Sequence, residues 1–241
     1  MRRNGKFSFF QNVGDYTNSI LKPQAAEAVR KFGEIELNGV NFPTPRNQCW
    51  PQAVPLIFYD ESVQLLQQPD KITLVYNYDH EVRHVLMNKP HLVGVTPSWS
   101  GDSIGHYEGD TLVIDTVGIK VGPFAMVDRF GTPHTEALHV VERYRLIDYD
   151  AALEWQERGL KDYLLAPGAD SAALVDSDYK GKGLQLEFTV EDEGVFTMPW
   201  SGIVTYRRGI PAWLEFVCAE NLRATYVTRD SAVPRAEKPD F

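Results

Sequence analysis

Residues 97–118, PSWSGDSIGHYEGDTLVIDTVG, bring several groups that could carry chemistry into one short span. His106 and Asp115 are of types that accept, donate or hold a proton, and Trp99 and Tyr107 beside them can line a site for a small aromatic molecule. The carboxylates on either side of the glycine in EGD have a structural explanation as well, because such groups stabilise tight turns.

Alternation along the expected strands places two carboxylates on apolar faces. Asp115 shares its face with Val113 and Val117, and Glu142 lies on a face with leucine, valine and tyrosine side chains. A carboxylate in such surroundings must accept hydrogen bonds or have a raised pKa. For Asp115 the structural alternative is an ion pair with an arginine of a neighbouring strand.

These residues define a hypothetical site for acid–base chemistry. We predict that His106 and His139 transfer protons, while Asp115 and Glu142 orient them or balance their charge. The residues predicted to bind substrate have aromatic, imidazole or guanidinium side chains in the same part of the chain: Trp99, Tyr107, Tyr76, His84, His134 and Arg143.

A metal site is an alternative use of the histidines. His106, His134 and His139 together with a carboxylate are possible ligands. However, His134 and His139 would lie on opposite faces of a continuous strand, and their spacing matches no common metal-binding pattern. The sequence also contains neither a serine nucleophile elbow nor a glycine-rich phosphate loop. We therefore predict no metal and no cofactor.

The elements that position these residues have the pattern of β-strands. Short runs with alternating apolar residues, separated by turn signals, cover 61–68, 71–78, 81–88, 103–118, 136–147, 183–192, 201–209 and 213–221. About eight sequential strands predict an all-β fold, an antiparallel up-and-down barrel of lipocalin-like shape that can hold one small ligand. A two-sheet β-sandwich is the alternative.

Two segments have helical character. Residues 21–32 form an amphipathic pattern with Pro23 in the first turn and Gly33 as the expected end, and a second helix is expected within 149–165. The proline-rich residues 41–55 are expected to wrap over the body of the domain. We predict one domain over 1–241, with the N-terminal helix and extended wrap in 1–60 and a helical insertion in 149–182.

Composition narrows the possible partners. The 241 residues have a formal net charge of -9 and no cluster of Lys and Arg, which argues against nucleic acid and anionic membranes as partners. No apolar run approaches the roughly 18–20 residues of a membrane span, and the first sixteen residues contain no apolar segment typical of an export signal. Cys49 and Cys218 are either two buried thiols or one disulfide, which would indicate an oxidising compartment.

The segment 97–118, together with GTPHTEALHVVERYRL, LEFTVEDEGVFTMPW and FVCAENLR, resembles the motifs of a large family of exported bacterial proteins without an established common activity. The resemblance covers about residues 20–225, with Tyr107 in place of the usual Trp and Thr135 in place of the usual Ser. It implies a periplasmic or secreted location, with the cytoplasm as the alternative, and favours a disulfide between Cys49 and Cys218. It implies no particular reaction.

The sequence therefore predicts a cofactor-free acid–base enzyme, a lyase, isomerase or hydrolase, that acts on a small apolar or aromatic molecule in the barrel cavity. The alternative is a periplasmic binding protein without catalysis, and a metal-dependent hydrolase is the third hypothesis. Nothing in the sequence indicates the oligomeric state.

Overall fold

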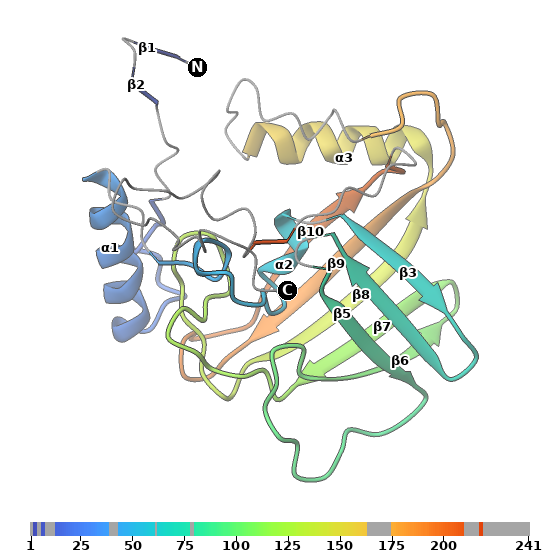
Figure 1. Cartoon of the computed structure of the whole chain (residues 1–241), viewed down its shortest axis with the longest axis horizontal. Helices are drawn as coiled ribbons and strands as arrows, with labels where there is room; N and C mark the ends of the chain where they lie inside the picture. The colour runs from blue at the N-terminus through green and yellow to red at the C-terminus, as the bar shows by residue number, and fades with distance from the viewer. Residues whose placement is uncertain are drawn as a thin grey trace, which may run out of the picture.

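A curled sheet of eight strands dominates the computed structural model (Figure 1). The structure describes residues 2–3, 6–7, 13–38, 43–60, 62–77, 80–162, 175–209 and 217–218. The strands of the sheet are β3 (Val63–Gln67), β4 (Lys71–Tyr76), β5 (Val82–Met87), β6 (Asp102–Glu108), β7 (Thr111–Val117), β8 (His139–Ile147), β9 (Gly183–Glu191) and β10 (Trp200–Tyr206). A separate two-stranded ribbon joins β1 (Arg2–Arg3) and β2 (Lys6–Phe7).

The eight strands lie side by side in chain order, which confirms the predicted all-β, barrel-like fold. The sheet forms a half-barrel whose edges are β3 and β10. All neighbouring strands are antiparallel except β5 and β6, which run parallel and so depart from the expected up-and-down order. A parallel pair needs a connection that crosses the length of the strands, and residues 88–101 provide it. We call this segment the crossover loop.

Each strand has one face that packs into the core and one that does not. In β4, Ile72, Leu74 and Tyr76 are buried and alternate with half-buried residues. At the β6–β7 hairpin, Gly109 adopts the expected positive φ of 59°. We call the core side of the sheet its inner face and the opposite side its outer face.

Two longer helices accompany the sheet. α1 (Pro23–Leu37) has its proline in the first turn, as predicted, but it continues for four residues beyond Gly33. The prediction that Gly33 ends the helix is wrong, because this glycine has a packing role. A Cβ atom there would lie 3.2 Å from Cγ1 of Val13. α3 (Tyr149–Asp162) is the predicted inserted helix, and it packs on β9 and β10.

The segment 43–60 packs through its last part against the inner face of the half-barrel. The segment contains η1 (Arg46–Gln48) and α2 (Ile57–Asp60), and its Val54, Ile57 and Phe58 belong to the main hydrophobic core. The hydroxyl of Tyr206 on β10 donates a 2.9 Å hydrogen bond to the carbonyl oxygen of Phe58. The inner side of the half-barrel is therefore occupied by packed side chains.

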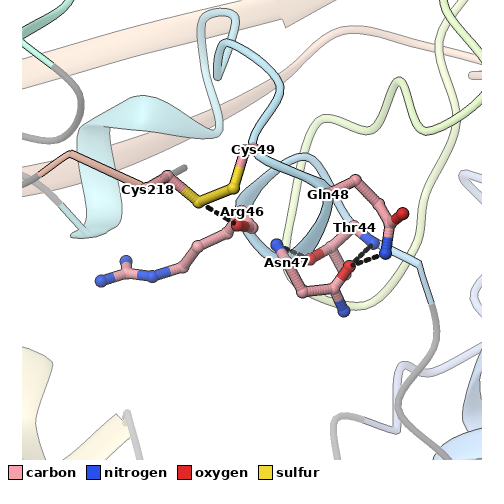
Figure 2. The surroundings of a disulfide bond; sticks show 6 residues. All are labelled: Thr44, Arg46, Asn47, Gln48, Cys49 and Cys218. Atoms are coloured by element: carbon pink, nitrogen blue, oxygen red, sulfur yellow. Dashed lines mark hydrogen bonds between the residues drawn. A yellow bond between two sulfur atoms is a disulfide. The ribbon is translucent and has the colours of Figure 1, made fainter. Parts of the chain in front are cut away.

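A disulfide bond joins Cys49 to Cys218, with the two Cα atoms 5.4 Å apart (Figure 2). It confirms the predicted bridge and supports an oxidising compartment. Next to it, the side chains of Thr44 and Asn47 cap each other's backbone N–H groups and fix the turn before Cys49. The predicted last strand, 213–221, lies outside the described residues apart from 217 and 218. Within the described part of the chain, no helix has the length and apolar character to cross a membrane.

Candidate functional site

Two histidines and three carboxylates alternate along the outer face of the sheet. The Nε2 atoms of His91 and His139 lie 3.1 and 2.9 Å from Oδ1 of Asp115. The other ring nitrogens face further carboxylates, since His91 Nδ1 is 2.8 Å from Asp102 and His139 Nδ1 is 3.5 Å from Glu191. We call these five residues the outer-face cluster.

Hydrogen bonds within the outer-face cluster change the pKa values of two of its residues. The hydrogen bond from His139 lowers the pKa of Asp115, and the same contact raises the pKa of His139. The expectation that Asp115 must be hydrogen-bonded is confirmed, although its partners are histidines and not an arginine. The side chains of His139 and Asp115 are 32% and 36% exposed and face away from the core. Their predicted catalytic role required side chains that point into the half-barrel, and these two do not.

The remaining candidates on the hairpin and nearby strands lie exposed at the surface. His106 is half exposed and lies 3.2 Å from Glu108, which also forms an ion pair of 2.6 Å with Arg143. Tyr107 is 50% exposed. His84 is also exposed, and its Nδ1 atom lies 3.1 Å from the hydroxyl oxygen of Thr73. This group borders neither of the pockets described below, so the structure does not bring these residues together with a cavity.

The inner face carries a buried ion pair. Arg83 on β5 holds Glu142 on β8 with two hydrogen bonds, one of them 3.1 Å long, and the two side chains are 3% and 0% exposed. Arg83 also donates hydrogen bonds to Ser103 and Thr116, at 2.9 and 2.6 Å. Tyr144 donates a hydrogen bond of 2.9 Å to Glu142. Glu142 was predicted to assist catalysis, but the structure places it in a buried ion pair with an arginine three strands away.

Tyr76 lies beside this ion pair with its hydroxyl group inside the core. Burial raises the pKa of Tyr76 to about 12, so the hydroxyl stays protonated at neutral pH. Hydrogen-bonding contacts with Arg83 and Tyr144 lower the pKa of Tyr76, but burial outweighs them.

An aromatic pocket lies where the segment before α2 meets the loop that precedes β8. Trp50 contacts Trp99 and Phe124 edge to face, with ring centroids 5.2 and 5.3 Å apart. The pocket is narrow and partly open to solvent, and we define it by Trp50, Trp99, Lys120, Phe124, Met126 and His134. Gly122 permits the close packing, because a Cβ atom there would lie 2.7 Å from the ring of Trp99.

His134 is the titratable group of the aromatic pocket, and it is only 5% exposed. Burial lowers its pKa below the ordinary value, which favours the neutral imidazole. Nδ1 lies 3.2 Å from the carbonyl oxygen of Thr135, and because a carbonyl only accepts, Nδ1 carries the proton. In the neutral ring, Nε2 is then a hydrogen-bond acceptor. Of the predicted binding residues, Trp99 and His134 are thus brought together here.

A second pocket shares Trp99 with the first. We call it the polar pocket, and it is narrow and partly open to solvent. Its lining includes Gln52, Tyr76, Glu81, Arg83, Trp99 and Ser100. Gln52 is 3% exposed, and its backbone N–H donates a 2.7 Å hydrogen bond to Glu81.

Sequence reasoning missed several residues of these sites. Arg83 lies on a face with Val85 and Met87, so the alternation that singled out Glu142 could have singled it out too. His91 lies in the crossover loop, where no periodicity indicates the direction of a side chain. Trp50 and Gln52 lie in a proline-rich segment without a strand or helix pattern, and only their neighbour Cys49 marked it.

Metal binding and similarity to other proteins give no further guide. Within the ranges that the structure describes, no three His, Cys, Asp or Glu side chains are grouped so as to hold a metal ion. No protein-family model, curated protein or solved structure matches the chain. The case for a function therefore depends on the geometry of the sites themselves.

Proposed function

We propose that the protein binds a small molecule with a single aromatic ring, in the bacterial periplasm. The observation that carries this proposal is the aromatic pocket, in which three aromatic rings and a buried imidazole border one cavity. Aromatic rings pack favourably edge to face or offset against other rings, so this lining favours a ligand with one aromatic ring. The disulfide supports an oxidising compartment, and the motif resemblance supports the periplasm.

The polar groups of the aromatic pocket indicate which ring it prefers. Nε2 of neutral His134 accepts a hydrogen bond, and a phenolic hydroxyl would supply one. The ammonium group of Lys120 lies 5.1 Å from the centre of the Trp99 ring, so a positive charge at the pocket also suits the electron-rich oxygen of a phenol. We therefore propose a phenol as the chemical class of ligand.

Binding is tested by titrating the oxidised protein with phenol and toluene and following tryptophan fluorescence and heat. We expect saturable binding with a preference for phenol, and Trp99→Ala should weaken it about tenfold or more because a large apolar contact is lost. Trp155→Ala is the matched control, since Trp155 lies on α3 and lines neither pocket. Absence of saturable binding, or equal losses in the two variants, would contradict the proposal.

A second candidate function, an acid–base enzyme, is favoured by the state of His134. A neutral imidazole with its proton on Nδ1 can act through Nε2 as a general base, for example on water that attacks a phenyl ester. Because its pKa is lowered, activity should be full above about pH 6.5 and fall only as the pH drops through the lowered value. His134→Gln should reduce hydrolysis of phenyl acetate about 100-fold or more. Equal rates in both proteins would remove His134 from catalysis.

A further inference from the structure

The strand β3 forms one edge of the half-barrel, and the side opposite β4 is open. No strand or bridge of the described chain lies on this side, which we call the free edge. All residues of β3 are exposed or half-buried, and the strand pairs with β4 without a bulge. Its sequence with one flanking residue at each end, 62–68, contains no charged residue and no proline. Because natural sheets usually protect an edge with lysine, proline or a bulge, an unprotected edge indicates a strand that pairs with another chain.

The hydrogen bonds to β4 show which backbone groups remain at the free edge. Asn77 donates its N–H to the carbonyl oxygen of Ser62, at 3.0 Å. At the other end of the pair, Gln68 donates its N–H to the carbonyl oxygen of Lys71, at 2.9 Å. Hydrogen-bonded and non-hydrogen-bonded pairs alternate along an antiparallel ladder. The even-numbered residues of β3 therefore bond to β4, and the odd-numbered residues direct their N–H and C=O groups to the free edge.

The odd-numbered residues Val63, Leu65 and Gln67 make the free edge complementary to itself. Their backbone groups at this edge have no hydrogen-bond partner among the residues that the structure describes. When two copies meet antiparallel about a two-fold axis at Leu65, this residue faces its own copy, and Val63 faces Gln67 of the other copy. These are the positions of hydrogen-bonded pairs, so every free group of one edge finds a partner on the other.

Charge and surroundings favour a second copy over a foreign extended segment. The chain has a formal net charge of -9, so two copies repel each other over most of their surface, whereas 62–68 is uncharged. Sites that bind peptides by strand addition obtain specificity from pockets for alternate side chains. No residue of β3 lines the aromatic pocket or the polar pocket. Pairing with an identical strand needs no such pocket.

We propose that β3 is the interface of a symmetric dimer, in which two half-barrels join into one continuous antiparallel sheet. Contact through a single strand buries little surface, so the dimer is weak and forms at protein concentrations on the order of 10–100 μM or above. The interface lies apart from both pockets, and the proposal does not depend on the proposed function.

The test measures association of the oxidised full-length protein and the register of the contact. Sedimentation velocity over ~5–500 μM should show a shift from monomer to dimer as the concentration rises. Amide hydrogen exchange, followed by NMR, should show protection of the odd-numbered amides of β3 over the same range. The amides of Gln64 and Leu66 bond to β4 and should be protected at every concentration.

Charged variants test the arrangement, because Gln64 of each copy lies opposite Leu66 of the other and both side chains are exposed in the monomer. The double variant Gln64→Lys, Leu66→Lys places like charges opposite each other and should weaken association about tenfold or more. Overall repulsion cannot explain this loss, since added lysines reduce the net charge of -9. The double variant Gln64→Glu, Leu66→Glu should also associate weakly, and an equimolar mixture of the two should regain association.

The matched control is the double variant Tyr107→Lys, Leu146→Lys, which adds the same charge at exposed positions of β6 and β8 and should associate like the parent. A parent that stays monomeric throughout the concentration range would overturn self-pairing and leave the edge to a different chain. A dimer without protection of the odd-numbered amides would place the interface elsewhere, and this exchange pattern needs no variant. Parental association of the lysine variant, or a mixture that does not regain association, would also overturn the proposal.

Discussion

At the scale of single residues, the inner face shows how one buried charge requires another. Arg83 and Glu142 come from different strands and face a core of apolar side chains. Each charge is unfavourable there alone, and the bidentate contact with the hydroxyl groups around it compensates for the loss of water. The pair therefore specifies how β5 and β8 are placed, more than it adds net stability.

Breaking this pair should be far more damaging than replacing it. We expect Glu142→Gln to lower the free energy of unfolding by ~3–5 kcal/mol, because Arg83 keeps an uncompensated buried charge. The double variant Arg83→Met, Glu142→Leu should recover most of that loss. The measurement is urea denaturation at pH 7. Glu108→Gln is the matched control, because it breaks an exposed ion pair with Arg143, the residue after Glu142 in β8, and should change stability much less.

The same residues show what alternation can and cannot predict. It placed both Glu142 and Asp115 on faces with apolar side chains, but it does not say which face becomes the core. Asp115 and His139 were assigned to a cavity because valines accompany them, whereas those valines lie on the outer face together with the cluster. The choice between faces depends on segments distant in sequence, such as 43–60, that cover one of them.

At the scale of elements, the crossover loop is the part that the sequence did not reveal. A meander of antiparallel strands needs only short turns, while the parallel β5–β6 pair requires residues 88–101 to return along the sheet. His91 holds this loop to β6 and β7 through Asp102 and Asp115, and Trp99 lies near its other end in both pockets. The outer-face cluster therefore fixes an element that also lines the candidate site.

The outer-face cluster should make stability depend on pH in a defined window. The raised pKa of His139 gives stabilisation that is full below about pH 6.5 and is lost as the pH rises through the folded-state value. The lowered pKa of Asp115 gives stabilisation that is lost as the pH falls through its folded-state value. We expect His139→Gln to lower Tm most near pH 5.5–6 and progressively less towards pH 9. His106→Gln, on the exposed hairpin, is the control, and a constant Tm difference for His139→Gln across this range would rule out the linkage.

At the scale of the whole molecule, the number and order of the strands were predictable because alternation and turn residues are local signals. The half-barrel, its inserted helix and the disulfide agree with the prediction. The filled inner side was not predictable, because the proline-rich segment has no periodic pattern and enters the core through Val54, Ile57 and Phe58. As a result, the candidate sites moved from the expected cavity to the pockets around Trp99.

The disulfide ties this segment into place and should matter for both stability and binding. It closes a loop of 169 residues, and in the loop-entropy model its removal lowers the free energy of unfolding by about 2–5 kcal/mol. Cys49 directly precedes Trp50, so the double variant Cys49→Ser, Cys218→Ser should also bind phenol more weakly. Urea denaturation and phenol titration measure the two effects, and reduction of the parent protein with dithiothreitol should reproduce both. If the oxidised parent shows two free thiols, the bridge is wrong; if the double variant loses stability but binds phenol unchanged, the aromatic pocket does not depend on the anchor at Cys49.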